Sequence, residues 1–232
     1  MKLFFKFFIF LSFFILNNFY SLHAKEYRAT YLIEVKTVNI GKLLWNINIS
    51  KNNYKMSLKL EDKGFFSGIY KFNGKYETSG LIVNNSLKPV KYKQTWITKK
   101  KERKVIISFN GDSLEELWLF PKEKEQPRIQ YIGVQNFLDP LSSFLNLLIG
   151  KNNSKTIDGR RVYTLVVDEK NKKDDTNIRK IFIKNYINIW ADHKRKDLEY
   201  IEIVQHLDEN DEILPIIIYI KFKNILFKLS KI

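Results

Sequence analysis

The chain has 232 residues, with 40 lysines and arginines against 25 aspartates and glutamates, which gives a formal net charge of +15. It contains no cysteine, so disulfides, a cysteine nucleophile and thiolate metal sites are excluded. Lysine greatly outnumbers arginine, the residue suited to bidentate phosphate contacts, so we expect no nucleic-acid partner and leave contact with anionic lipid headgroups open.

The first predicted element is a secretory signal peptide over residues 1–24. Lys2 gives a positive start, an apolar segment follows from Phe7 to Leu16, and the small residue Ala24 marks the exit. We expect cleavage after Ala24 and a periplasmic mature protein. The apolar segment is shorter than the roughly 20 residues of a spanning helix, so an N-terminally anchored inner-membrane protein is the less favoured alternative. Any further membrane contact is expected to be peripheral at most.

Residues 25–232 are predicted to form a single β-rich domain, because apolar and polar residues alternate along most of this region. Glycines in its first half are expected to mark turns and bends of a curved sheet. The strands are expected at Tyr27–Val35, Leu43–Ile49, Tyr54–Leu60, Pro89–Thr98, Arg103–Phe109, Leu117–Phe120, Arg161–Val167, Asn177–Ile183, Leu198–Gln205, Leu214–Lys221 and Ile225–Leu229.

One segment breaks the alternation and predicts an amphipathic helix over Asp139–Ile149. Asp139 is suited to the N-cap, Pro140 to the first helical position, and Gly150 to the position after the end. An apolar stripe at helical spacing is formed by Leu141, Phe144, Leu145 and Leu148. The predicted fold is therefore mainly β: a curved antiparallel sheet, or half-open barrel, closed by one amphipathic helix.

With these elements placed, the chain resembles the exported proteobacterial family catalogued as domain of unknown function 3108. The resemblance is carried by Asp139-Pro140-Leu141-Ser142, which opens the helix, and by Asp158-Gly159-Arg160-Arg161-x-Tyr163-x-Leu165, which opens the next strand. The Tyr54 strand followed by Gly64, the segment Leu87-Lys88-Pro89 and the segment Leu214-Pro215 agree in order and spacing. The resemblance implies an exported, mostly antiparallel half-open barrel and no settled activity.

The candidate binding residues are Asp139, Ser142, Asp158, Arg160 and Arg161. Helix capping explains Asp139 and Ser142, and a turn explains Asp158. Neighbours on a strand point to opposite faces, so at most one of the two arginines can face a cavity. We favour an ion pair of one arginine with Asp139 or Asp158; the alternative is an anionic headgroup held at a pocket mouth.

No catalytic, metal or cofactor site is predicted. The histidines His193 and His206 have no convergent ligands at zinc spacing, Ser142 lies in no nucleophile elbow, and no phosphate-binding glycine loop occurs. We expect a non-enzymatic protein that binds a lipid or a hydrophobic segment of an envelope component. The alternatives are a solid-cored interaction module that binds an envelope protein, and a hydrolase with an unrecognised site.

Overall fold

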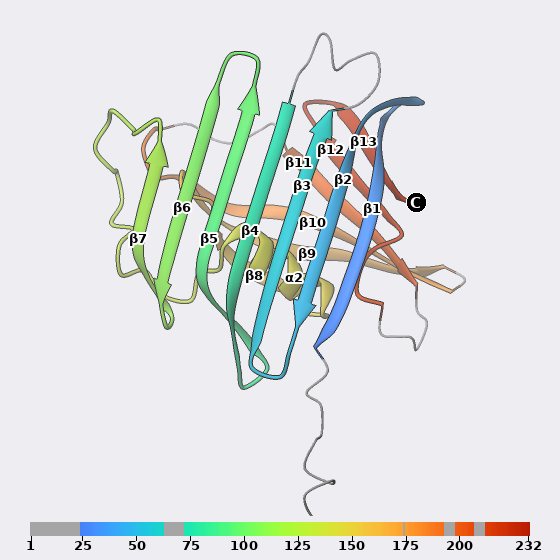
Figure 1. Cartoon of the computed structure of the whole chain (residues 1–232), viewed down its shortest axis with the longest axis horizontal. Coiled ribbons are helices and arrows are strands. Elements are labelled where there is room, and N and C mark those ends of the chain that lie inside the picture. The colour runs from blue at the N-terminus through green and yellow to red at the C-terminus, as the bar shows by residue number, and fades with distance from the viewer. Residues whose placement is uncertain (1–23, 63–71, 174, 193–197, 207–211) are drawn as a thin grey trace, which may run out of the picture.

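The computed structural model describes residues 24–62, 72–173, 175–192, 198–206 and 212–232. The predicted signal peptide lies outside this part except for Ala24. Within the described residues, thirteen strands form one antiparallel sheet in the order β7-β6-β5-β4-β3-β2-β1-β13-β12-β11-β10-β9-β8 (Figure 1). No helix among the described residues has the length and apolarity needed to cross a membrane.

The sheet consists of two meanders joined through the first and last strands. The first meander contains β1 (Lys25–Val35), β2 (Val38–Ile49), β3 (Asn53–Asp62), β4 (Phe72–Val83), β5 (Ser86–Thr98), β6 (Glu102–Asn110) and β7 (Ser113–Phe120). The second contains β8 (Asn153–Ile157), β9 (Arg161–Lys173), β10 (Thr176–Asn188), β11 (Leu198–His206), β12 (Ile217–Phe222) and β13 (Ile225–Lys231). The joint is the antiparallel pair β1·β13, in which Tyr31 lies opposite Lys231.

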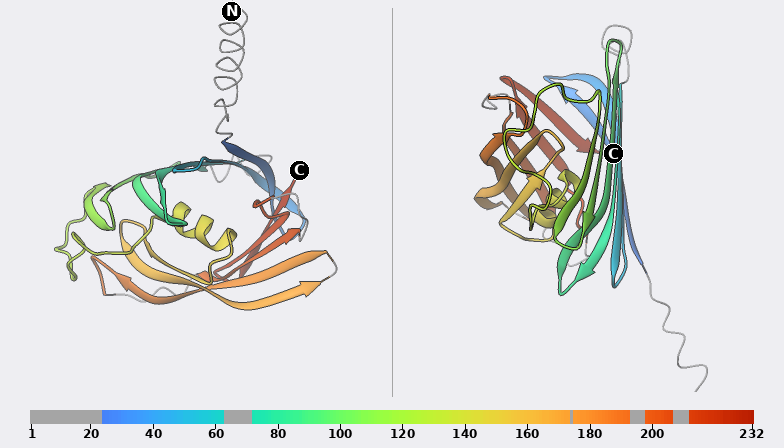
Figure 2. Two further views of the ribbon diagram at one scale, coloured as in Figure 1. Left: turned by 90° about the horizontal axis from the view of Figure 1, so that it is seen from below. Right: turned by 90° about the vertical axis from the view of Figure 1, so that its left-hand side faces the viewer.

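The two meanders face each other as two layers, with the helix between them (Figure 2). The order of strands ends at β7 on one side and β8 on the other, so the sheet is curved but not closed. The predicted half-open antiparallel barrel is therefore confirmed. We call the gap between the β7 end and the β8–β9 end of the sheet the seam.

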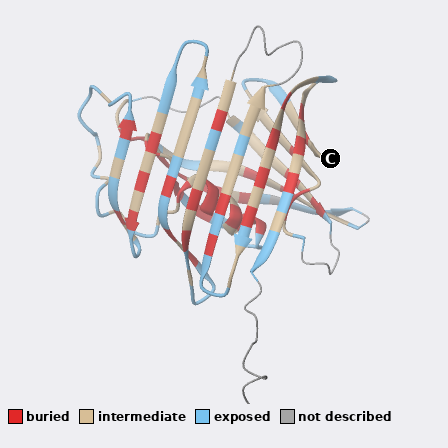
Figure 3. Ribbon diagram, in the orientation of Figure 1, coloured by how far each residue is buried: buried red, intermediate tan, exposed pale blue. Residues whose placement is uncertain are grey.

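The predicted helix is confirmed as α2 (Pro140–Leu148), with Asp139 as its N-cap. Its leucines are buried on more than one side: Leu145 and Leu147 have no exposed surface, and Leu148 is 5% exposed. The rings of Phe144 and Trp45 lie 5.6 Å apart. A single apolar stripe was the expectation, but a helix between two sheet layers is covered from both. Burial is concentrated around it and on the strands that cross it (Figure 3).

Two strands were not predicted, β4 and β8. β8 lacks the alternation of apolar and polar residues because its inward residues Ser154 and Thr156 are polar, although both are buried. Within β4, Gly80 allows close approach of neighbouring groups: a Cβ there would lie 2.4 Å from the Lys88 carbonyl oxygen and 2.6 Å from the Tyr54 ring. One expected strand is shorter than predicted: the strand expected from Leu214 begins only at Ile217.

Candidate functional site

A buried polar cluster lies at the N-terminus of α2. One carboxylate oxygen of Asp139, Oδ1, accepts hydrogen bonds from the backbone N–H groups of Leu141 (3.0 Å) and Ser142 (3.1 Å). The other, Oδ2, accepts from the hydroxyls of Thr78 (2.8 Å) and Ser142 (2.5 Å). Tyr54 Oη lies 2.7 Å from Ser142 Oγ. The cluster thereby fastens the helix to strands β3 and β4.

This cluster is removed from water. Asp139, Ser142 and Tyr54 have no exposed surface, and Thr78 is 4% exposed. Burial raises the pKa of Asp139, although the four hydrogen bonds to its carboxylate oppose that rise. Burial also raises the pKa of Tyr54, and the Asp139 charge adds to it. Because every member bonds to another member, this geometry anchors a helix and presents no group to a solvent-borne ligand.

The Asp-Gly-Arg-Arg motif forms the turn between β8 and β9. Asp158 Oδ1 accepts hydrogen bonds from the backbone N–H groups of Arg160 (3.0 Å) and Arg161 (2.9 Å). Gly159 has a φ of +93°, and a Cβ there would lie 2.6 Å from a methyl carbon of Val105. Glycine is therefore required at position 159 for two reasons: the backbone is left-handed there, and a side chain would collide with the inner face of β6.

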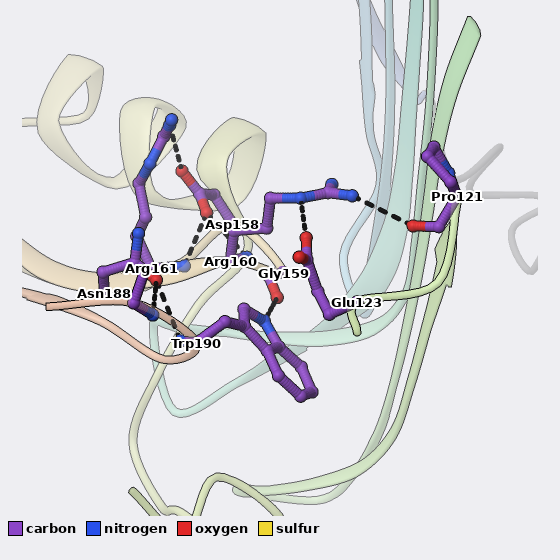
Figure 4. Close-up of polar contacts among 9 residues, drawn as sticks. Pro121, Glu123, Asp158, Gly159, Arg160, Arg161, Asn188 and Trp190 are labelled. Atoms are coloured by element: carbon purple, nitrogen blue, oxygen red, sulfur yellow. Dashed lines mark hydrogen bonds and ion pairs between the residues drawn. The ribbon is translucent and has the colours of Figure 1, made fainter. Parts of the chain in front are cut away.

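The two arginines of the motif extend in different directions, Arg161 toward Asp158 and Arg160 toward Glu123 (Figure 4). Arg161 Nη1 lies 3.3 Å from Asp158 Oδ2, which is one of the arginine–aspartate pairs that the sequence left open. Arg160 crosses the seam, where Nε bonds to the Glu123 carboxylate and Nη2 donates to the Pro121 carbonyl oxygen at 3.2 Å. Arg160 therefore holds the segment after β7 against the start of β9.

Trp190 covers the same turn from the end of β10. Its indole Nε1 donates to the Gly159 carbonyl oxygen at 3.3 Å, and its backbone N–H donates to Asn188 Oδ1 at 2.8 Å (Figure 4). Its ring lies 5.4 Å from that of Tyr131. Aromatic side chains from two distant segments thus meet beside the Asp-Gly-Arg-Arg turn.

These groups border a cavity of about 740 Å³, which we call the seam pocket. Leu117 and Leu119 of β7 line it together with Tyr131 and Trp190, and the charged segment 122–126 supplies the remaining side. Arg160 is not among the lining residues but is bonded to one of them, Glu123. The pocket is therefore lined on one side by aromatic and aliphatic side chains and on the other by charged and polar ones.

The structure thus sorts the predicted residues into two clusters. It joins Asp139 with Ser142, and Asp158 with Arg160 and Arg161; neither arginine is paired with Asp139. Tyr54, Thr78, Glu123 and Trp190 also belong to these clusters but were missed. Tyr54 and Thr78 carry no motif, and Glu123 reaches Arg160 across 37 positions of the chain. Among the described residues, no group of three His, Asp or Glu side chains could hold a metal ion.

Comparison with known proteins places this geometry in a family. A family model described as "Protein of unknown function (DUF3108)" matches residues 26–190, which include both clusters and the seam pocket. The chain belongs to this family. The matched region of the DUF3108 family ends at Trp190, before β11, β12 and β13.

A solved structure shares the fold. The β-barrel-like protein of domain of unknown function DUF1849 from Brucella abortus superposes with a TM-score of 0.51, at 10% sequence identity. The match covers 91% of this DUF3108 chain and 98% of that chain. At this identity the likeness concerns the fold alone. No curated protein matches the chain.

Proposed function

We propose that this protein is a non-enzymatic binding protein of the bacterial cell envelope that holds an apolar chain, from a lipid or a hydrophobic segment, in the seam pocket. The observation that carries the proposal is the pocket of about 740 Å³ between Leu117, Leu119, Tyr131 and Trp190. Its volume lies within the roughly 300–1,000 Å³ of small-molecule sites. The export signal read from residues 1–24 supports the envelope as its location.

The open edge of the sheet supports the choice of this pocket over the space beneath the helix. The sequence alone left two possibilities for the interior between helix and sheet, a ligand cavity or a solid core. The interior between helix and sheet holds buried apolar side chains, including Leu145, Leu147 and Trp45, and a core of normal packing density has no room for an acyl chain. At the seam, by contrast, aromatic and aliphatic groups lie beside lysines and glutamates. An amphipathic ligand with a polar end suits this arrangement.

The test is native mass spectrometry of the protein purified from an envelope fraction, combined with titration by the apolar probe N-phenylnaphthylamine. Leu117→Glu places a charge in the pocket and is expected to weaken probe binding at least tenfold. The control is Ile225→Glu, at a 45% exposed position outside the pocket. Equal probe binding by both variants, with no lipid retained by the unaltered protein, would overturn the proposal.

A second candidate is supported by the many buried apolar side chains of the interior: a solid-cored interaction module that binds another envelope protein through its surface. Crosslinking in intact cells distinguishes the interaction module from the lipid-binding protein. The module is expected to crosslink repeatedly to one protein partner, whereas the lipid-binding protein is expected to crosslink to lipid. The hydrolase alternative receives little support, because Ser142 is fully buried and bonded to Asp139 and Tyr54.

A further inference from the structure

The outer face of the first meander carries lysines that differ in their pairing. Several have a carboxylate two residues away on their own strand: Lys59 with Glu61 at 2.6 Å, Lys75 with Glu77 at 2.9 Å, and Lys104 with Glu102 at 3.0 Å. Such exposed pairs neutralise each other and are typical of an ordinary solvated sheet face.

Three other lysines on this face, Lys55, Lys91 and Lys93, have no carboxylate within ion-pair distance in the part of the chain that the structure describes. Lys55 and Lys91 both face Ser79, from opposite sides of β4, so their strands are separated by about 9.5 Å. Lys91 and Lys93 point to the same face about 6.7 Å apart. All three are exposed.

These lysines line a shallow groove of about 380 Å³ on the outer face. Hydrogen-bonding side chains of Asn46, Asn48, Ser57 and Ser79 complete most of its lining. The carboxylate in the groove, Glu77, is the one already paired with Lys75. The groove therefore has a surplus of positive charge and many neutral donors, which is the chemistry of a site for phosphate groups.

Apolar side chains extend from the same face next to the lysines. Ile106 lies opposite Lys93 across β5·β6, and Trp118 lies opposite Ile106 across β6·β7. Trp118 is 43% exposed and Phe120 44% exposed. A free phosphate ion or a soluble polyanion would use only the lysines. A bilayer offers both an anionic headgroup layer and an apolar region within reach of such rings.

We propose that this outer face of β2–β7 docks on a membrane that contains anionic phospholipids, with headgroup phosphates in the groove of Lys55, Lys91 and Lys93. The layer that carries the face is nearly straight along its strands and arched across them, with the helix on its inner side (Figure 2), so the outer face is its convex side. Trp118 also lines the seam pocket. Docking brings that pocket to the membrane surface, but the docking itself does not depend on the pocket holding a ligand.

The test is co-sedimentation with vesicles of phosphatidylethanolamine and phosphatidylglycerol, using the full chain in the form that the cell produces. Each basic residue near an anionic surface contributes roughly fivefold to binding. We therefore expect Lys55→Gln/Lys91→Gln/Lys93→Gln to lower the partition coefficient about 10- to 100-fold. The control is Lys151→Gln/Lys172→Gln/Lys173→Gln, which removes three exposed charges outside β2–β7. The control is expected to bind as the unaltered protein does.

Three outcomes would overturn the inference: equal loss in both triple variants, equal binding to phosphatidylcholine vesicles, or complete competition by inorganic phosphate, which would indicate a small-ion site. Circular dichroism and thermal unfolding check that the variants remain folded. The seam-pocket variant Leu117→Glu is tested in parallel for probe binding and vesicle binding. It is expected to lose probe binding and keep vesicle binding, so failure of docking and failure of the seam-pocket function are distinguishable.

Discussion

Asp139 and Arg179 hold the two ends of helix α2, a carboxylate at its N-terminus and a guanidinium at its C-terminus. Arg179 is 5% exposed. Its Nη1 bonds to the Leu147 carbonyl oxygen, and its Nη2 donates to the Leu148 carbonyl oxygen at 3.3 Å. Asp139 caps the first turn. Each charge has the sign that the helix dipole favours at its position, and each comes from a segment outside the helix body.

The first prediction concerns Arg179→Met. This change keeps side-chain volume but removes the guanidinium donor from the Leu148 carbonyl oxygen and the Gln205 side chain, and one of two donors from the Leu147 carbonyl oxygen. We expect the free energy of unfolding to fall by about 2–4 kcal/mol, measured by chemical denaturation. Arg179→Lys retains a charge and is expected to lose less. Equal stability of Arg179→Met and the unaltered protein would contradict the bonding described.

The second prediction concerns pH. The pKa of Asp139 is raised in the folded protein because the carboxyl is buried, so the folded state holds its proton more tightly than the unfolded state. The resulting stability is fully present below the unfolded pKa and is lost as pH rises through the folded pKa. Asp139→Asn keeps a capping oxygen and is expected to remove this decline. Urea unfolding of the unaltered protein and of Asp139→Asn is measured from below the unfolded pKa of Asp139 to above its folded pKa. Parallel curves of unfolding free energy against pH would refute the expectation.

The third prediction separates two roles of glycine. Gly159 and Gly150 both have positive φ, +93° and +102°, but only Gly159 has neighbours within reach of a Cβ. Gly150→Ala therefore measures backbone strain alone, about 1 kcal/mol. Gly159→Ala adds the collision with Val105 and is expected to cost about 1–3 kcal/mol more. Thermal unfolding of both proteins provides the comparison, and equal losses would show that the collision is relieved without cost.

The fourth prediction separates the two arginines of the motif. Arg160→Gln breaks the bonds to Glu123 and Pro121 across the seam. It is expected to weaken N-phenylnaphthylamine binding about 3- to 10-fold, because the segment beside the pocket is no longer held. Arg161→Gln removes the pair with Asp158 and is expected to leave probe affinity unchanged. Fluorescence titration measures both; if Arg161→Gln weakens binding equally, the seam contact is not the cause.

The sequence predicted the helix and most strands because their signals are local. The capping set Asp139, Pro140 and Gly150 occurs within one short segment, and alternation marked strands such as β3 and β6. The strand β8 was not predicted because two of its three buried positions are the polar Ser154 and Thr156, whose burial depends on partners elsewhere. Thr156, for example, donates its hydroxyl hydrogen to Ser143 Oγ of the helix at 2.8 Å.

The candidate site could be predicted only in part, for the same physical reason. Asp158 and Arg161 are near neighbours in the chain, so their ion pair was foreseeable. Arg160 and Glu123 meet only because the open sheet brings the end of β7 to the start of β9. The seam pocket is a consequence of that non-local arrangement, and no periodicity or short motif marks its lining.

The pairing of β1 with β13 has a consequence for the order of folding. β1 is synthesised first, yet one of its two hydrogen-bonded edges is filled by the last strand of the sheet. Until β13 arrives, the first meander has an unpaired edge in what becomes the middle of the molecule. Such an edge is a template for wrong pairing, and closing so long a loop slows folding. The newly made chain therefore has its greatest need of protection from aggregation before its final strand is in place.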